Sequence, residues 1–376
     1  MVQPGTIRVA LDAHVVGRRG TGNETYVVNL ARALSERPDV EPIVYVDTGA
    51  TWPGQAPAHL RRLTTRAPFL RIPIELPVRA RRDRAHLLHV QYVAPPVAGL
   101  PVVVSVHDVS FEDVPGLFPR RTELRLKASV RVTALRARSI LVLSSFTRDR
   151  IVTHYGIDPA RIFVAPCGVS PAWRPLASEN RQRTLGHLNL PASFVLAVGN
   201  LHPRKNIPRL IRAVATARRG AVGDLHLVLV GQRGWRAEDV DTEIDAVGGA
   251  GWVRTLGYVS DETLRALYGA ARVVAYPSIY EGFGLPVVEA MACGAVVLSS
   301  RTTSIPEVAG DAALLVDPAD DQSVADGLVR AVTDEELRAH LSEAGPARAA
   351  EFTWWRCAEV TVAAYRAALH ATGSWP

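Results

Sequence analysis

Two glutamates separated by seven residues, Glu281 and Glu289, stand in a glycine-rich segment that follows an apolar stretch over 273–276. Pro286 suits the first position of a helix, where its missing N–H costs nothing. The backbone N–H groups just before it would then be unsatisfied donors at the positive end of that helix, which favours a bound anion. Three residues offer these amides: Phe283, Gly284 and Leu285.

Both carboxylates can serve a ligand at this segment. A carboxylate accepts two hydrogen bonds at once, which suits the vicinal hydroxyls of a sugar or a ribose. We expect Glu281 on the loop and Glu289 in the first helical turn. The alternative is that Glu289 only complements the helix dipole, and this segment alone does not decide between the two.

Arg204 and Lys205 precede a second expected helix, over 207–217. Two adjacent cations at a helix N-terminus are electrostatically unfavourable for the helix itself, and they become favourable when an anion binds there. Among the 43 Lys and Arg residues of the chain, only Lys127 and Lys205 are lysines. A lysine offers a compact point charge and an arginine a planar fork. We therefore interpret Lys205 as a functional cation.

Length and composition favour a globular protein with two domains. The chain has 376 residues, of which 48% are hydrophobic and 21% charged, and this length exceeds the size at which one core keeps growing. The sequence shows neither a signal-peptide pattern nor an apolar run long enough to span a bilayer. Three scattered cysteines suit a reducing compartment, so we expect a cytoplasmic protein. Motifs of zinc proteases and P-loop NTPases do not occur in the sequence.

Short apolar stretches alternate with helical patterns along both halves of the chain, which indicates two parallel sheets covered by helices. The expected strands of the first half cover 7–11, 43–46, 87–90, 102–106 and 140–143. Those of the second half cover 194–198, 225–230, 253–256, 273–276, 296–298 and 314–316. Amphipathic helices are expected over 24–34, 123–135 and 354–369. The predicted fold class is α/β, with two Rossmann-like parallel-sheet domains facing across a cleft.

A segment over 165–175 contains three prolines and is typical of a linker between domains. We place the first domain over 1–168 and the second over 169–354. The final helix, over 355–376, is expected to dock back on the first domain. Ligands of open α/β sheets bind at the carboxyl ends of the strands, so the cleft between the domains is the expected site.

Taken in order, the charged segments resemble the motifs of one enzyme family. The segments over 199–206, 257–262 and 281–289 resemble those of the retaining glycosyltransferases of family four, which have the GT-B fold. Similar stretches continue the resemblance at 20–30, 106–108, 166–169, 304–313 and 352–355. The resemblance therefore covers nearly the whole chain, and the order and spacing of the motifs make it specific.

This resemblance implies a role for each candidate residue in binding a nucleotide sugar. Glu289 would hold the ribose hydroxyls, and Glu281 would lie against the transferred sugar. Arg204 and Lys205 would neutralise the departing diphosphate, and His107 would contact the sugar from the first domain. Further donor contacts are implied for Gly22, Gly199, Asn200, Tyr258, Val259, Phe283, Gly284 and Leu285.

One position departs from the family pattern. Some relatives carry an arginine directly after the glycine that matches Gly199, whereas this chain has Asn200. Arg204 would then have to supply that charge. For His107, the alternative to a catalytic role is a strand histidine with satisfied hydrogen bonds beside Asp108.

The implied reaction is the retaining transfer of a hexose, as in polysaccharide biosynthesis. GDP-mannose is the first candidate donor, and the acceptor would be a hydroxyl of a glycan or a lipid-linked molecule. Fixed cations and a helix N-terminus would stabilise the negative charge that builds on the leaving diphosphate. A front-face transfer, in which the leaving phosphate helps to deprotonate the acceptor, does not need the paired carboxylates of retaining hydrolases. No DxD-type pair stands where a metal would bridge the phosphates, so we expect no metal and no other cofactor.

The net charge of +6 is carried mainly by arginines of the first half of the chain, at 61–84 and 120–138. An anionic membrane or a lipid-phosphate acceptor would suit such a basic face, which would then place the protein at the inner face of the membrane. The alternative is a solvated surface without a partner. Nucleic acid is not an expected partner, because aromatic residues do not alternate with these arginines.

Three other functions are open at this point. The segment over 20–25, followed by Asp47, is similar to the fingerprint of a NAD-binding oxidoreductase, although Thr25 stands where the third glycine would be. A sugar-nucleotide epimerase or a phosphorylase shares the fold class, and a phosphorylase would need Lys205 to hold pyridoxal phosphate. A non-catalytic binding protein with two lobes would leave the paired charges of the second domain unexplained.

Overall fold

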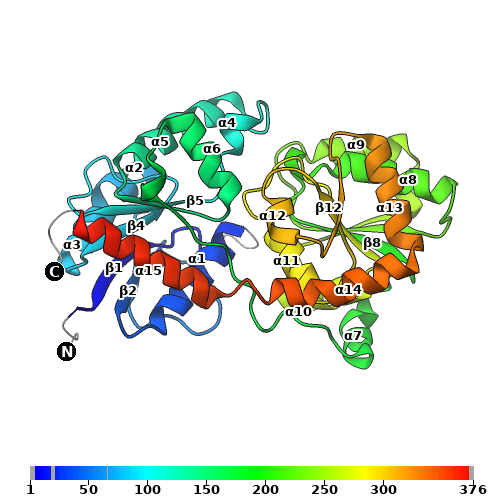
Figure 1. Ribbon diagram of the computed structural model, residues 1–376, viewed down its shortest axis with the longest axis horizontal. Helices are drawn as coiled ribbons and strands as arrows, with labels where there is room; N and C mark the ends of the chain where they lie inside the picture. The colour runs from blue at the N-terminus through cyan, green and yellow to red at the C-terminus, as the bar shows by residue number, and fades with distance from the viewer. Residues whose placement is uncertain (1–4, 18–21, 66, 372–376) are drawn as a thin grey trace. The chain divides into compact units, whose positions relative to one another are not determined.

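The computed structural model divides into two compact units, and each unit contains one parallel sheet with helices on it (Figure 1). The predicted class, α/β with two Rossmann-like sheets, is confirmed. Unit 1 comprises Met1–Gly168 and Thr353–Pro376, and unit 2 comprises Val169–Phe352. The structure describes residues 5–17, 22–65 and 67–371.

The described residues of unit 1 form a seven-stranded parallel sheet in the order β3-β2-β1-β4-β5-β6-β7. Its strands are β1 (Ile7–Asp12), β2 (Val40–Val46), β3 (Leu60–Arg62), β4 (Leu87–Gln91), β5 (Val102–Val106), β6 (Ser139–Val142) and β7 (Ile162–Val164). The sequence analysis missed β3 and β7. β3 is an edge strand with the sequence Leu-Arg-Arg, and β7 has three residues, so neither shows an apolar run of normal strand length.

Helices connect these strands and cover the sheet of unit 1 (Figure 1). They are α1 (Gly22–Ser35), α2 (Pro68–Leu70), α3 (Leu76–Arg82), α4 (Ser110–Asp113), α5 (Arg120–Arg136), α6 (Ser145–Tyr155) and α15 (Trp354–His370), with a π-helical turn η1 (Arg71–Glu75) and a 3-10 turn η2 (Pro159–Arg161). The helix α15 returns from the end of the chain and packs on α1 and on strands β5, β6 and β7.

A buried chain of hydrogen bonds joins α15 to the sheet and to α1. Tyr365 Oη lies 2.7 Å from His89 Nδ1, and His89 Nε2 lies 2.7 Å from Ser105 Oγ. Ser105 Oγ lies 2.9 Å from Tyr26 Oη. All four side chains are buried, and burial lowers the pKa of His89 to about 3, which keeps its ring neutral. Because buried polar groups are costly when they are left unpaired, this network specifies where α15 docks.

The described residues of unit 2 form a six-stranded parallel sheet in the order β10-β9-β8-β11-β12-β13. Its strands are β8 (Phe194–Val198), β9 (His226–Val230), β10 (Val253–Gly257), β11 (Val273–Tyr276), β12 (Val297–Ser300) and β13 (Leu314–Val316). The strand order reverses between β8 and β11, because the chain adds β9 and β10 on one side before it returns to the other. Ligands of such sheets bind outside the carboxyl ends of the strands at this point.

The helices of unit 2 follow these strands in turn (Figure 1). They are α7 (Ser178–Leu185), α8 (Ile207–Arg219), α9 (Glu238–Ala246), α10 (Asp261–Ala270), α11 (Leu285–Ala292), α12 (Ile305–Ala309), α13 (Asp321–Thr333) and α14 (Glu335–Ala349), with 3-10 turns η3 (Gly186–Leu188), η4 (Pro203–Lys205) and η5 (Gly249–Gly251). The helix expected over 207–217 is α8, and the two cations expected at its start lie in η4 just ahead of it.

The chain crosses between the units twice, and the two crossings lie side by side. The N–H of Val169 donates to the carbonyl of Phe352 at 2.9 Å. A Cβ atom on Gly168 would lie 2.1 Å from the backbone nitrogen of Trp354, so only glycine fits there. The second crossing follows Phe352, and α15 begins at Trp354. The second crossing therefore lies two residues before the boundary predicted after residue 354, because Thr353 caps α15 through its side chain.

In the part of the chain that the structure describes, no helix combines the length and the apolar character that crossing a membrane requires.

Candidate functional site

The carboxyl ends of β8 and β11 bring a lysine, a glutamate and a tyrosine into contact. Lys205 ends the turn after β8, and its Nζ lies 2.6 Å from Oε1 of Glu281 on the loop after β11. The same Nζ donates to Tyr276 Oη and lies 4.4 Å from the centre of that ring. Lys205 is 8% exposed and Glu281 is 5% exposed. These two charges, 76 residues apart in the sequence, therefore form one buried pair at the point where the strand order reverses.

The carboxylate of Glu281 is held in its ionised form. Burial alone would raise the pKa of Glu281, but the charges of Lys205 and Arg204 outweigh it and hold the pKa below its usual value. The backbone is fixed as well, since the N–H of Glu281 donates to Thr303 Oγ1 at 3.3 Å and its carbonyl accepts from Ser304 Oγ at 2.9 Å. The site thus presents a cation and a carboxylate whose positions are set before any ligand arrives.

Gly199 and Arg204 fit closely around Lys205. Gly199 has a φ of 131°, and a Cβ atom there would lie 3.2 Å from Lys205 Cε. The carbonyl of Arg204 accepts a hydrogen bond from the N–H of Ile279 at 2.8 Å. Asn200, the residue that departs from the family pattern, accepts through Oδ1 from the N–H of Gln232 at 3.3 Å. Asn200 therefore ties neighbouring loops together, and Arg204 lies in the same turn as Lys205.

The helix α11 begins one residue earlier than the sequence indicates. Its first residue is Leu285, so Pro286 is the second and not the first. Gly284 precedes the helix with a φ of 97°, and a Cβ atom there would lie 2.6 Å from Ile305 Cδ1. Phe283 is buried and packs edge-on against Phe352, with ring centres 5.5 Å apart. The packing around Phe283 and Gly284 fixes the path of the backbone whose amides open α11.

Glu289 lies one turn further along α11 than predicted. It is the fifth helical residue, and the first turn contains no acidic residue. Tyr268 Oη donates to Glu289 Oε2 at 3.3 Å. Burial, with a smaller effect of Asp261, raises the pKa of Glu289 to about 8. A largely neutral carboxyl beyond the first turn does little for the helix dipole, so the dipole does not explain why this residue is a glutamate.

Three large apolar side chains are exposed among the described residues of unit 2, and all three follow strands at the carboxyl edge of the sheet. They are Trp235 after β9, Tyr258 after β10 and Ile279 after β11. Tyr258 is 52% exposed, and its half-buried neighbour Val259 leads toward α10. Tyr258 and Val259 were predicted from the sequence as donor contacts, whereas Trp235, which is 45% exposed, was not. Trp235 could have been found from the sequence, because it is a tryptophan in a glycine-containing loop that follows a buried strand.

Backbone hydrogen bonds join the loops that carry these residues. The N–H of Leu201, after β8, donates to the carbonyl of Gln232 at 2.8 Å, and the N–H of Gly234 donates back to Leu201 at 3.1 Å. The N–H of Gly231 donates to the carbonyl of Gly257 at 2.9 Å. The loop of Trp235 is therefore the connection between the turn that holds Lys205 and the loop that holds Tyr258.

In unit 1, His107 directly follows β5 and is buried between two aromatic rings. The ring of Tyr26 meets it edge-on at 4.6 Å, and the ring of Tyr92 stacks on it at 5.4 Å, between ring centres. Burial lowers the pKa of His107 to about 4, so the imidazole is neutral at neutral pH. Its Nε2 has no hydrogen-bond partner among the described residues. His107 is therefore not the fully satisfied strand histidine considered as the alternative.

Charged residues at the ends of β1 and β2 were mostly missed by the sequence analysis. Asp12 ends β1 and is buried, and its Oδ2 lies 2.9 Å from His14 Nδ1. Burial opposes ionisation of Asp12, but His14 and Arg71 outweigh it and lower the pKa. Asp47 accepts from Nη1 of the buried Arg71 at 3.0 Å. Asp47 thus has a structural partner, which argues against its role as the ribose acid of a dinucleotide site.

Gly22 is the first residue of α1 and is exposed. The preceding residues of its motif, Gly20 and Thr21, lie outside the residues that the structure describes. Glu24, in the first turn of α1, accepts from the N–H of Gly17 at 2.8 Å, so the two sides of this loop are joined. Gly22 and His107 belong to unit 1, and their approach to the residues of unit 2 stays a prediction.

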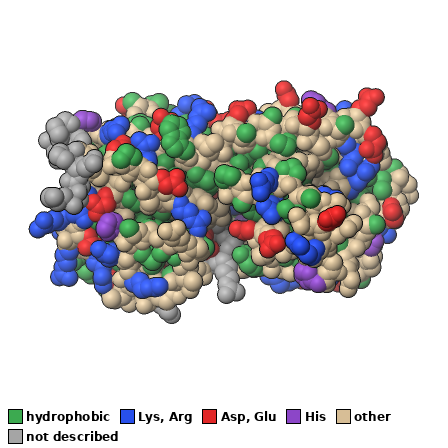
Figure 2. Space-filling view, turned by 90° about the horizontal axis from the view of Figure 1, so that it is seen from below, with side chains coloured by type: hydrophobic (Ala, Val, Ile, Leu, Met, Phe, Trp, Pro, Cys, Tyr) green, Lys and Arg blue, Asp and Glu red, His purple; other side chains and the backbone are tan. Residues whose placement is uncertain are grey.

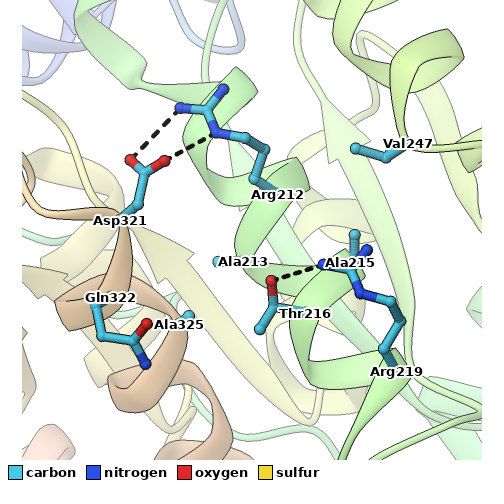
Figure 3. A pocket seen from close by; sticks show the side chains of 9 residues that line it. All are labelled: Arg212, Ala213, Ala215, Thr216, Arg219, Val247, Asp321, Gln322 and Ala325. Carbon is cyan, nitrogen blue, oxygen red and sulfur yellow. Dashed lines mark hydrogen bonds and ion pairs between the residues drawn. The ribbon is translucent and has the colours of Figure 1, made fainter.

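Two other features of the structure do not form part of this site. Among the described residues, no three His, Cys, Asp or Glu side chains gather into a group that could hold a metal ion. A cavity of about 240 Å³ lies between α8 and α13 (Figure 3). Its Arg212 is paired with Asp321 at 3.0 Å and with Glu243 at 2.5 Å, and its exposed Arg219 donates to Thr216 Oγ1 at 3.2 Å.

Two family models together match most of the chain. The model described as Glycosyltransferase Family 4 matches residues 20–173, and the model described as Glycosyl transferases group 1 matches residues 180–348. O-antigen chain mannosyltransferase B of Escherichia coli is 34% identical over 265 residues, which are 70% of this chain and 70% of that protein. MMP alpha-(1->4)-mannosyltransferase of Mycolicibacterium hassiacum is 33% identical over 236 residues, which are 61% of this chain and 54% of that protein.

Solved structures share the fold. Sucrose-phosphate synthase from Thermosynechococcus elongatus superimposes with a TM-score of 0.80 at 22% identity, covering 97% of this chain and 100% of that chain. HepE from Anabaena, solved with UDP and glucose, gives a TM-score of 0.77 at 20% identity, covering 96% of this chain and 99% of that chain.

The two Rossmann-like units define a glycosyltransferase of the GT-B class. The chain belongs to glycosyltransferase family 4, as the sequence motifs predicted, and it is a transferase enzyme. The NAD-binding oxidoreductase, the epimerase or phosphorylase and the non-catalytic binding protein are therefore set aside.

Proposed function

We propose that the chain transfers a hexose, with retention, from a nucleotide diphosphate sugar to a hydroxyl of a glycan or lipid-linked acceptor in polysaccharide biosynthesis. GDP-mannose is the proposed donor, and the relatives described as mannosyltransferases support mannose. The buried pair of Lys205 and Glu281 is the observation that carries this proposal, because it places a fixed cation where the strand order reverses.

In this proposal, Lys205 and Arg204 take the charge of the leaving diphosphate. Breaking the anomeric bond leaves the bonding electrons on the diphosphate oxygen, and the sugar becomes electron-poor. A cation that is already in position stabilises the growing negative charge without reorganisation. The amides that open α11, at Phe283, Gly284 and Leu285, add donors at the positive end of a helix.

The nucleoside would lie over the loops after β9 and β10. Glu289 binds the ribose hydroxyls, with Tyr268 orienting its carboxyl group. Tyr258 and Val259 face the base, and Trp235 offers it an exposed aromatic surface between the loops of Lys205 and Tyr258. Stacking on such a surface suits any base, so this contact favours a nucleotide without selecting guanine.

The transferred sugar would lie against Glu281 of unit 2, and its contact with His107 of unit 1 stays a prediction. The neutral imidazole of His107 can accept or donate a hydrogen bond through its unpartnered Nε2. Glu281 keeps a negative charge close to the electron-poor sugar. The acceptor hydroxyl attacks the anomeric carbon on the face from which the diphosphate leaves, and its proton passes to a phosphate oxygen. Neither a metal nor another cofactor enters this proposal, and the cytoplasmic location at the inner membrane face also stays a prediction.

A donor panel tests the proposed function. GDP-mannose, UDP-glucose and NAD are titrated against the protein by calorimetry, and release of sugar from the bound nucleotide is followed by proton NMR. We expect GDP-mannose to bind, NAD to give no binding, and the first-formed mannose to have the α configuration of the donor. Release of β-mannose would exclude retention, and preference for UDP-glucose would overturn the proposed donor.

A further inference from the structure

A long apolar groove lies in unit 1, apart from the residues assigned to the donor. Its volume is about 1170 Å³, above the roughly 300–1,000 Å³ of ordinary small-molecule pockets. Three stretches of chain and His14, after β1, line it. The stretches are η1 with Phe69 of α2, the loop between β4 and β5, and α5 with the residues after it. Apolar side chains such as Ile72, Val93, Leu100, Leu126 and Val132 make up most of the lining.

The groove runs along the sheet from one edge to the other. Val93 follows the carboxyl end of β4, whereas Pro101 precedes the amino end of the parallel β5. Helix α5 leads from the carboxyl end of β5 back to the amino end of β6, so Arg125 lies toward the carboxyl edge and Arg136 toward the amino edge. A strand of five residues is about 17 Å long. The groove is therefore elongated, and one of its ends lies at the edge where β5 leads into His107.

Apolar side chains are also exposed around this groove. Among the described residues, eight of the twelve exposed large apolar side chains belong to the segments that build or adjoin it. Phe69 is 75% exposed, Val97 is 73% exposed and Val132 is 48% exposed. Exposed apolar surface gathered in one region of a protein marks a binding surface more often than a solvated one.

The exposed charges in the groove are positive. Arg125, Arg136 and Arg138 line it and are exposed, and no carboxylate of the described residues forms an ion pair with them. The acidic residue of α5, Glu123, is already paired with Lys127 at 2.9 Å. Inside the groove, Arg71 is 1% exposed. Its Nη1 is paired with Asp47 at 3.0 Å, whereas its Nε has no hydrogen-bond partner in the part of the chain that the structure describes.

We propose that this groove binds the hydrocarbon chain of a long-chain lipid phosphate, and that this lipid carries the acceptor. The phosphate lies at the carboxyl-edge end, within reach of Arg125 and of Nε of Arg71, and the chain follows the apolar lining toward Arg136 and Arg138. The lipid class rests on the proposed transfer to a lipid-linked acceptor, whereas binding to the groove does not depend on it.

A flat anionic bilayer does not account for these features. A bilayer surface would not reach Arg71, because that side chain is buried in the groove. The face of the molecule drawn in Figure 2 carries acidic and basic side chains intermixed on both units, and α5 lies at the opposite, upper side of unit 1 in Figure 1. At the groove, three exposed arginines, Arg125, Arg136 and Arg138, border an apolar lining whose size and chemistry suit a hydrocarbon chain.

Calorimetric titration with farnesyl phosphate below its micelle-forming concentration tests this proposal. We expect saturable binding with one molecule per chain, at least tenfold weaker binding of farnesol, and no binding of inorganic phosphate at the same concentration. Absence of farnesyl phosphate binding would overturn the proposal. Binding to vesicles of anionic phospholipid without binding of the monomeric amphiphile would also overturn it, since it would identify a membrane-docking surface.

Two matched pairs of variants on α5 locate the binding. Val132→Asp places a charge in the groove lining, and Leu135→Asp places one on the same helix at a residue that is 46% exposed but does not line the groove. Arg125→Glu and Arg131→Glu form the second pair, with Arg131 outside the lining. We expect the groove variants to weaken farnesyl phosphate binding at least tenfold and the controls to leave it unchanged. Equal effects of the two variants within each pair would contradict binding of farnesyl phosphate in the groove.

Donor binding separates this proposal from the proposed function. Val132→Asp lies away from the donor residues and should bind GDP-mannose as the wild type does. If wild type binds farnesyl phosphate but no nucleotide sugar, the groove stands and the proposed function fails. If wild type binds the nucleotide sugar but no farnesyl phosphate, the groove proposal fails and the proposed function is unaffected.

Discussion

Glu289 has an unusually high pKa for a glutamate, so its contribution to the free energy of unfolding depends on pH. The pKa is raised from 4.5 to about 8 by burial. Between these two values the folded protein binds more protons than the unfolded chain, so the free energy of unfolding falls as the pH rises through this window. Glu289→Gln removes this effect. We expect the variant to be more stable than wild type above pH 8, by on the order of a few kcal/mol, and the difference to vanish near pH 4.

Urea unfolding of both proteins between pH 4 and pH 9 measures this difference. The exposed Glu262→Gln serves as the control and should follow the wild type at every pH. Above pH 8, where the carboxyl of Glu289 is ionised, the same Glu289→Gln variant should bind GDP more weakly than wild type, by about 1.5–3 kcal/mol, because it loses a charge-assisted hydrogen bond to the ribose. Parallel pH profiles for Glu289→Gln and wild type would contradict the raised pKa, because they would show that Glu289 has the same pKa in the folded and the unfolded protein.

Trp235 is predicted to contribute to donor binding but not to the chemical step. A contact that is equally strong in the ground state and the transition state changes KM and leaves kcat unchanged. Trp235→Ala should raise the KM for the nucleotide sugar by the equivalent of about 1–3 kcal/mol, the range for stacking of one base. Trp355→Ala, another exposed tryptophan but in unit 1, should leave KM unchanged. A fall in kcat with constant KM would contradict the stacking role.

The residues of the donor site could be predicted from the sequence only in part. Glycines, adjacent cations and spaced glutamates indicated which loops form the site, because adjacent cations at a helix N-terminus are unfavourable there without an anion. The contact of Lys205 with Glu281 could not be predicted, since it depends on how β8 and β11 pair across the sheet. The pKa of Glu289 was not predictable either, because it depends on how deeply the packing around α11 buries this side chain.

At the scale of elements, the docking of α15 depends on the hydrogen bond between Tyr365 and His89. Tyr365→Phe would leave His89 Nδ1 buried without a partner, which costs about 1–3 kcal/mol. We expect unit 1 of this variant to unfold at a lower urea concentration than in wild type. Tyr258→Phe removes a hydroxyl from an exposed side chain and should cause no shift. If Tyr365→Phe is as stable as wild type, water or another group satisfies His89, and the network does not specify the docking.

Regular strands with apolar runs could be predicted, whereas short or charged elements could not. The strand β3 consists of Leu60 and two arginines, and it is a strand only because β2 offers it a free edge. The start of α11 was displaced by one residue because Gly284 takes a left-handed conformation against Ile305. Both errors arise from tertiary contacts that outweigh local preference.

At the scale of the whole molecule, the two-unit division could be predicted from the repeated alternation of strands and helices and from the prolines after residue 165. The groove of unit 1 could not. Its lining comes from residues between His14 and Arg138, and each of its apolar segments resembles an ordinary part of a core. The sequence indicated a basic surface, but only the fold shows that Arg125, Arg136 and Arg138 line one apolar groove.

The central claim is that Lys205 stabilises the leaving diphosphate, and sugar release by Lys205 variants, measured from low to saturating concentrations of GDP-mannose, tests it most directly. Lys127→Ala, at the other lysine, is the control, and thermal unfolding verifies that each variant is folded. We expect Lys205→Ala to lower kcat and kcat/KM together by about a hundredfold, and Lys205→Arg to lose much of the activity because its planar group misplaces the charge. Full activity of folded Lys205→Ala would contradict the account.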